Sequence, residues 1–291
     1  GWVYWSNWDG VADAANSIQL QRGLSAVNLA TPSIGGTMNI ITDPASNERG
    51  GKFKQEGGAG NFLKTTFNYN TGLMLGDKLA LSGTLVRKTG DGIIDATWTD
   101  AWAYYLGSSL QLNEDHRFEL YAIGAPQRHG QNLYKQNIAT YSQDLASDVD
   151  GYDVTAFAEG NKFETEAGRT FNQNWGPVSS DYTGKQYWYM YGVGGLFGGG
   201  NQPRYSANFL NERENFFHKP LVNLNHFMTI NEKTRLSSVL YWSGGSGGGT
   251  GTYGSSFRKP AVDGQKWYRS SPWGWDWDAA IATNSDRVDT K

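Results

Sequence analysis

Three aspartates stand close together around a glycine in the middle of the chain. Asp148, Asp150 and Asp153 place carboxylates at short intervals on either side of Gly151. Hard oxygen ligands at such intervals suit Ca²⁺, but the bidentate Glu of a calcium-binding loop is missing at the expected position. The three residues are therefore retained as a calcium candidate, and a solvated acidic loop is the favoured interpretation.

The residue types needed for catalysis are present but are not arranged for it. The four histidines show no spacing typical of a metal-ligand pair. No Ser/His/Asp set with a nucleophile-elbow motif occurs. The glycine-rich stretch 192–200 lacks the Lys-Ser/Thr that follows a phosphate-binding loop. We therefore predict no enzyme activity and no cofactor.

Aromatic residues gather in places where they could contact a ligand. Aromatic faces bind organic groups by stacking, and this interpretation is favoured for the N-terminal group, Trp2, Tyr4, Trp5 and Trp8. For the groups near 187–191 and 267–277, ligand binding and loop packing stay equally open. Trp98, Trp102 and Trp242 stand near predicted strand ends and are interpreted as part of an aromatic girdle at a membrane interface.

The composition narrows the class of scaffold that positions these residues. Of the 291 residues, 38% are hydrophobic and 18% are charged, while 38 are glycine and 12 are tryptophan. This profile is typical of extracellular β proteins and of outer-membrane barrels, in which only alternate residues of a strand face lipid. The net charge of −3 argues against a nucleic-acid partner. The absence of cysteine excludes disulfides and thiol chemistry.

Alternation of apolar and polar residues predicts antiparallel strands from about residue 50 onward. The segment 63–73 places one set of side chains on a single face: Leu63, Phe67, Tyr69 and Leu73. Short turns are predicted at 76–78, 113–116 and 231–233, and long irregular segments at 89–101, 126–217 and from 244 onward. Since the short turns would all fall at one end, the pattern favours a membrane barrel over a soluble sandwich.

The stretch that precedes these strands resembles a known family. Residues 18–26 and 34–42 read IQLQRGLSA and IGGTMNIIT. They are similar to the end of the plug domain in TonB-dependent outer-membrane receptors, which typically reads IEVLRGPSSALYGSGAIGGVINIIT. Residues 51–92 resemble the first barrel strands of that family. Leu24 replaces the usual proline, and residues 30–33 replace a glycine-containing turn.

The resemblance implies a fold class, a function and a set of partners. It implies an all-β membrane protein, part of a plugged antiparallel transmembrane β-barrel that has about 22 strands when complete. Residues 1–46 would be the C-terminal part of the plug. Residues 47–291 would begin the barrel, with extracellular loops at about 126–217 and 244–291. The chain would then be a piece of a longer protein.

By the same resemblance, the receptor would import a nutrient (a glycan, a peptide or a metal chelate) across the outer membrane of a Gram-negative bacterium. The plug would rearrange when the inner-membrane TonB complex pulls on an N-terminal box, which these residues do not include. The other expected partners are the nutrient, the outer-membrane lipids and a surface lipoprotein that acts as a lid.

Individual residues of the plug stretch also have expected roles. A short helix is predicted at Val11–Asn16, with Asp9 as its cap. Arg22 is expected to pair with carboxylates of the inner barrel wall, because guanidinium–carboxylate bonds are bidentate and strong; the alternative is an ordinary surface arginine. A backbone motif is formed by Gly23, Gly35 and Gly36. Adjacent glycines permit close approach or a positive φ before the next strand.

Two other classes of protein fit the same residues. One is a surface component for binding or assembly that keeps the plugged-barrel fold without importing anything. The other is a secreted, soluble β protein that binds carbohydrate. The soluble protein would need no detergent and, if it were a hydrolase, would carry a paired carboxylate site, which the sequence does not reveal.

Overall fold

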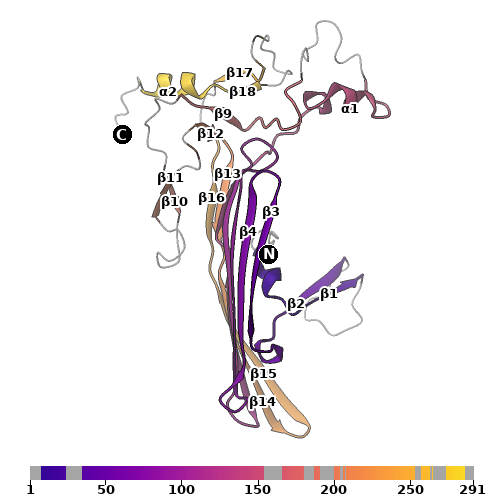
Figure 1. The fold of residues 1–291 in the computed structure, drawn as a ribbon, viewed down its shortest axis with the longest axis vertical. Helices are drawn as coiled ribbons and strands as arrows, with labels where there is room; N and C mark the ends of the chain where they lie inside the picture. Colours follow the sequence, from indigo (N-terminus) through magenta and orange to yellow (C-terminus); the bar gives the residue numbers. More distant parts are fainter. Residues whose placement is uncertain are drawn as a thin grey trace.

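The fold is taken from a computed structural model of the chain. It describes residues 8–23, 35–153, 166–179, 187–190, 200–203, 206, 208–252, 257–262, 264 and 273–285. Figure 1 shows a tall, curved sheet, a smaller N-terminal part beside it, and a group of short elements over one end.

The tall sheet is antiparallel and has ten strands. Its main path runs β15-β14-β7-β6-β5-β4-β3. The strands of this path are β3 (Gly50–Gly58), β4 (Phe62–Met74), β5 (Leu79–Gly90), β6 (Thr99–Gln111), β7 (His116–Gly124), β14 (Leu221–Asn231) and β15 (Thr234–Ser243). We call this path the wall. Strands β4 and β6 have 13 residues each, more than the roughly 9–11 that a tilted strand needs to cross a bilayer.

The two faces of the wall differ in chemistry. On the outward face large apolar side chains are exposed, among them Phe67 (52%) and Leu106 (61%). On the inward face of β5 the side chains are small or polar and are buried, as Ala80, Ser82 and Thr84 show. The predicted alternation is therefore present, and the burial identifies which side each set faces.

Three short turns of the wall lie at one end; the other end has the turn at residues 59–61, the connection at residues 91–98 and the long connection between β7 and β14 (Figure 1). The short turns are residues 75–78, 112–115 and 232–233. The antiparallel order places successive connections at alternate ends of the wall, but it does not set their lengths. No helix in the described part of the chain is both long enough and apolar enough to cross a membrane.

A β-bulge interrupts β4 near its lower end. Asn70 pairs with Ser82, but Leu73 pairs with Ala80, so two residues of β4 oppose one residue of β5. Gly72 there has a φ of 65°, and the Thr71 hydroxyl accepts the hydrogen bond of the Leu81 N–H at 2.9 Å. Because directly paired residues share a face, Leu73 lies on the inward face with Ala80.

The bulge overturns one expectation from the alternation. Leu73 was expected on the face of Leu63, Phe67 and Tyr69, and this is wrong. An inserted residue shifts the period of two by one position, and a simple alternation rule cannot detect it.

The wall continues beyond its upper end through three shorter strands, β8 (Gln127–Gly130), β13 (Glu214–His218) and β16 (Ser246–Gly249). β13 pairs with β8 on one side and β16 on the other. These strands lie inside the ranges expected to be irregular. Gly247 of β16 lies so close to β13 that a Cβ there would stand 2.7 Å from the Phe217 Cβ. The glycines thus permit close packing on β13.

Short elements make up the rest of the upper end (Figure 1). They are η4 (Ile138–Thr140), α1 (Gln143–Ser147), β9 (Trp175–Pro177), β10 (Tyr187–Met190), β11 (Gly200–Pro203), β12 (Phe209–Asn211), β17 (Arg258–Pro260), β18 (Trp273–Trp275) and α2 (Trp277–Ser285). The strands form the antiparallel pairs β9–β12, β10–β11 and β17–β18.

The N-terminal part consists of η2 (Val11–Ala14), β1 (Ser17–Arg22), β2 (Gly36–Ile41) and η3 (Pro44–Ser46). β1 and β2 pair as a two-stranded antiparallel sheet. The expected cap of the first helix is wrong: Gly10 is the N-cap residue, in a left-handed conformation and without a side-chain cap. Asp9 instead forms an ion pair with the wall.

Candidate functional site

The candidate site is the interface between the N-terminal part and the inward face of the wall. Its first component is charged. Nζ of Lys64 lies 2.9 Å from Oδ2 of Asp13, and Lys88 pairs with Asp9. Oε2 of Glu56 on β3 lies 3.5 Å from the same Lys64 nitrogen. We call Asp9, Asp13, Glu56, Lys64 and Lys88 the charged contact.

Gly10 brings the two aspartates close to the wall. It has a φ of 88°, and a Cβ there would stand 2.5 Å from the Ala103 Cβ and 3.6 Å from the Val86 Cβ. Val86 and Ala103 are buried inward-facing residues of β5 and β6. The glycine therefore serves both the left-handed turn and direct contact with two wall strands.

The second component is neutral. Nδ2 of Asn16 donates to Oδ1 of Asn47 at 2.7 Å, and Oδ1 of Asn16 accepts from the Asp43 N–H at 2.8 Å. Nδ2 of Asn47 in turn donates to Oδ1 of Asn70 and to Oγ of Ser82, both at 3.4 Å. We call Asn16, Asn47, Asn70 and Ser82 the amide contact. It joins the start of β1 to β4 and β5 beside the point where the chain enters the wall.

Aromatic packing supports the amide contact. Pro44 is fully buried on β6, where a Cβ at Gly107 would stand 3.0 Å from the Pro44 Cγ. The Tyr121 hydroxyl donates to the Thr42 carbonyl at 3.4 Å, and the Tyr121 ring stacks on Tyr105 at 6.3 Å between centroids. Residues 42–47 are thus held by packing as well as by hydrogen bonds.

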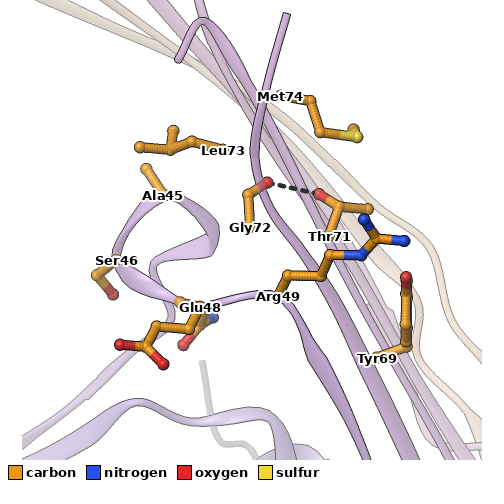
Figure 2. A pocket seen from close by; sticks show the side chains of 10 residues that line it. Ala45, Ser46, Glu48, Arg49, Tyr69, Thr71, Gly72, Leu73 and Met74 are labelled. Carbon is orange, nitrogen blue, oxygen red and sulfur yellow. Dashed lines mark hydrogen bonds between the residues drawn. The ribbon is translucent and has the colours of Figure 1, made fainter. Parts of the chain in front are cut away.

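Two cavities flank the interface. One, of about 550 Å³, lies between the N-terminal part and the inward face of β6, β7 and β14; Trp8, Met38, Glu119 and Asn223 are among the residues that line it. The other, of about 570 Å³, lies between residues 45–49 and the bulge of β4. Figure 2 shows the second cavity, with Ala45 and Leu73 on the same side of the β4 ribbon and the Arg49 side chain extended past Thr71.

The plug residues selected from the sequence lie at the far end of the β1–β2 sheet. Arg22 pairs through its backbone with Gly36, and its side chain is exposed. No ion pair links Arg22 to another described residue, so pairing with the barrel wall stays a prediction. Gly36 has a φ of 123°, and a Cβ there would stand 2.4 Å from the Gln21 carbonyl oxygen; Gly23 has a φ of 73°. Gly35 has open space around it.

Of the candidate ligand and metal residues, only one is described at the interface. Trp8 lines the first cavity, whereas Trp2, Tyr4 and Trp5 lie outside the described residues. Asp148, Asp150 and Asp153 are exposed. Within the described ranges, no group of three or more His, Asp or Glu side chains is placed to hold a metal ion.

Two of the three tryptophans assigned to the girdle have the expected exposure, Trp102 (42%) and Trp242 (55%). The assignment of Trp98 is wrong, because this residue is fully buried, with the Arg128 guanidinium 5.4 Å from its ring centre. Trp273 and Trp275 are also buried, and the Arg258 guanidinium lies 4.0 Å from the Trp273 ring centre. These two rings therefore pack loops together.

A buried carboxylate organises the upper loops. The Glu212 side chain is 2% exposed and accepts hydrogen bonds from Nδ2 of Asn174 at 3.0 Å and Oγ1 of Thr252 at 2.8 Å. The Tyr134 hydroxyl adds a bond at 3.3 Å. Such a carboxylate is stable in a buried site because its oxygens are hydrogen-bonded, and it ties four separate loop segments together.

Burial also changes the acidity of groups beyond the wall strands. It raises the pKa of Glu214 on β13 to about 7, against the opposing effect of Arg128. Burial lowers the pKa of His129 on β8; Lys88 lowers it further, and Asp9 acts in the opposite direction. His129 is therefore electrostatically coupled to the charged contact.

Sequence reasoning did not select Lys64, Lys88, Gly10 or Asn47. A signal existed for the lysines, since each stands on the polar face of a predicted strand. Their contact with Asp9 and Asp13 is non-local and could not be read from the alternation.

Comparisons with known proteins were made for the whole chain. No family model matches it, and no curated protein matches it. Among solved structures, the open form of the ferric-catecholate import receptor Fiu from E. coli K12 is similar, with a TM-score of 0.52 and 13% identity over 80% of this chain and 29% of that receptor. The closed form gives a TM-score of 0.52 and 13% identity over 81% of this chain and 27% of the receptor.

The chain thus spans less than a third of the receptor that it resembles. At this identity the likeness concerns the fold. The predicted fold class, part of a plugged antiparallel β-barrel, is confirmed as a fold.

Proposed function

We propose that this chain is part of a TonB-dependent outer-membrane receptor that imports a nutrient into a Gram-negative bacterium. Residues 1–46 are the end of its plug, and residues 47–291 begin its barrel, with 126–217 and 244–291 outside the cell. The TonB complex, the nutrient, the outer-membrane lipids and a surface lipoprotein lid are its proposed partners. The nutrient is a glycan, a peptide or a metal chelate.

The observation that carries this proposal is the inverted polarity of the wall. A soluble sandwich buries its apolar face and exposes its polar face. Here Phe67, Leu106 and Leu120 are exposed, while Ser82 and Thr84 are buried. The buried polar face is covered by the N-terminal part of the same chain, as a plug would cover a lumen. A lipid bilayer is the surrounding in which such an outward face is stable.

The membrane position can be tested on β14 of the full-length receptor in lipid vesicles. Leu224 is 37% exposed on the outward face, and the next residue, Asn225, faces inward and lines the first cavity. Leu224→Cys and Asn225→Cys each receive a bimane label; these 291 residues contain no other cysteine, and any cysteine elsewhere in the receptor is first replaced by serine. Nitroxide-labelled lipid should quench the bimane at position 224 much more than that at 225. Equal quenching at both positions would contradict the membrane wall.

Transport can be tested by fastening the plug to the wall. Asp13→Cys and Lys64→Cys place thiols on the two sides of the charged contact, and a short bifunctional thiol reagent joins them. Cells carrying the receptor are grown with ferric siderophores, oligosaccharides or peptides as the sole iron or carbon source. Receptor-dependent growth should stop after cross-linking and continue when either single-cysteine variant is treated. Ligand binding without any receptor-dependent growth would instead favour the non-transporting surface component.

A further inference from the structure

Lys64 and Lys88 stand directly opposite each other on neighbouring strands. They are register partners on β4 and β5, so their Cβ atoms are about 5 Å apart. Like charges in this arrangement repel each other. Both side chains point to the inward face and keep about a fifth of their surface exposed. The wall therefore brings two ammonium groups to one place inside the predicted lumen.

The wall itself supplies little compensation for these two charges. Among the described residues, its only carboxylate in contact with either lysine is Glu56, at 3.5 Å from Lys64, and Glu56 also pairs with Lys54 at 2.8 Å. The main counter-charges are Asp9 and Asp13. Both belong to the short turn around η2. Because Gly10 has no side chain, this turn lies in direct contact with Ala103. Two carboxylates from a separate segment thus fill a site that the wall forms with its lysines.

We infer that Lys64 and Lys88 form an anion-binding site that the turn at residues 9–14 occupies, and that a ligand with two neighbouring carboxylate or phosphate groups competes with Asp9 and Asp13 for it. Binding of such a ligand would release the turn from the wall. Partly exposed ion pairs are weak and are screened by salt, so the exchange of one anionic partner for another is feasible. Lysine suits this role because its charge is compact and its stem is flexible.

The inference deepens the proposed function, since it names the class of ligand that would loosen the plug. It rests on that proposal only for the statement that the ligand is imported. Competition at the lysines needs only the wall and the turn, and it can be measured in the isolated receptor without transport.

The test is a titration of the full-length receptor in detergent with pyrophosphate, which carries two adjacent anionic groups. Hydrogen exchange of residues 9–14 and calorimetric binding are both followed, with sodium chloride at matched ionic strength as the reference. Pyrophosphate should raise exchange in residues 9–14 beyond the chloride effect. Asp9→Asn with Asp13→Asn should bind pyrophosphate roughly tenfold more tightly, because two weak competing ion pairs are lost.

Lys64→Gln with Lys88→Gln should abolish both responses. Lys78→Gln, which removes an exposed lysine from the short turn at the opposite end of the hairpin, should behave as the parent receptor does. The inference is overturned if the double glutamine variant still responds to pyrophosphate, or if the double asparagine variant binds it no more tightly. Anion binding in a receptor that supports no uptake would refute the proposed import and leave the anion site intact.

Discussion

The charged contact and the amide contact join the same N-terminal part to the same wall, but they use different chemistry. Asp9 and Asp13 meet lysines that repel each other, across an interface that keeps partial access to solvent. Asn16 and Asn47 meet neutral groups next to the entry of the chain into β3. The difference indicates a division of roles: the charged contact can be exchanged for other ions, and the amide contact holds the point where the N-terminal part is tethered.

Gly10→Val is expected to cause the largest difference in stability between the charged contact and the amide contact. The variant forces a side chain into the space of Ala103 and a branched residue into a positive φ, at a cost of roughly 4 kcal/mol. Hydrogen exchange should increase in residues 9–14 and stay low in residues 42–47. Gly76→Val is the matched control, because Gly76 has a φ of 67° but open space around it. Equal protection of residues 9–14 in both variants would show that the close approach of Gly10 is unimportant.

Changing the pH should affect a third region, the upper strands. Because the folded-state pKa of Glu214 is raised from 4.5 to about 7, the neutral carboxyl is the form that the fold favours. Its contribution is complete below about pH 4.5 and is lost as the pH rises through about 7, a change of roughly 3 kcal/mol in the free energy of local opening. Exchange in β13, corrected for intrinsic rates, should rise between pH 5 and pH 8 in the parent. Glu214→Gln should remove that rise, and a persistent pH dependence would assign it to another group.

A smaller effect is expected from Asn47→Ala. The substitution removes the donor to Asn70 and Ser82 and the acceptor for Asn16, which should weaken residues 42–47 by about 1–2 kcal/mol. High salt should leave this loss unchanged, because no net charge is involved. Urea-induced exposure of residues 42–47, followed by exchange with and without 1 M NaCl, provides the measurement. A salt-dependent loss would remove the distinction between the two contacts.

The smallest effect is expected from Asp13→Asn. One partly exposed ion pair contributes about 0.5–1 kcal/mol to the free energy of local opening of residues 9–14. At 1 M salt the screening length is about 3 Å, so this free energy should become the same in the parent and the variant. The same exchange experiment on residues 9–14 gives both values. If the variant remained weaker than the parent at 1 M salt, hydrogen bonding of Asp13 would be the main contribution.

The parts of the fold that could be predicted are those controlled by local pattern. Alternation located the wall strands, and the stretch from Ile18 to Thr42 located β1 and β2, because both signals need only neighbouring residues. The upper strands could not be found in this way. β16 consists of serine and glycine, which gives no alternation of apolar and polar residues. Its glycines leave room for Phe216 and Phe217 of β13, where a Cβ would be too close.

The candidate site was predictable to a smaller extent. Asp9 precedes a helical turn, and in isolation it is a reasonable cap; a lysine 79 positions further along the chain changes its role. Asn47 and Pro44 likewise depend on β4, β5 and β6. Contacts of this kind arise only when the sheet is assembled, and the sequence offers no local signal for them.

The bulge at Thr71 and Gly72 has a consequence at the other end of its hairpin. If the pairing of Met74 with Leu79 continued without interruption, Lys64 would stand opposite Thr89 and Lys88 opposite Thr65. The inserted residue moves the upper half of β4 by one place, and lysine then meets lysine. One backbone irregularity near a short turn therefore decides the electrostatic pattern of the lumen some distance away. Deleting Gly72 would be expected to separate the two like charges while leaving every charged residue in the chain.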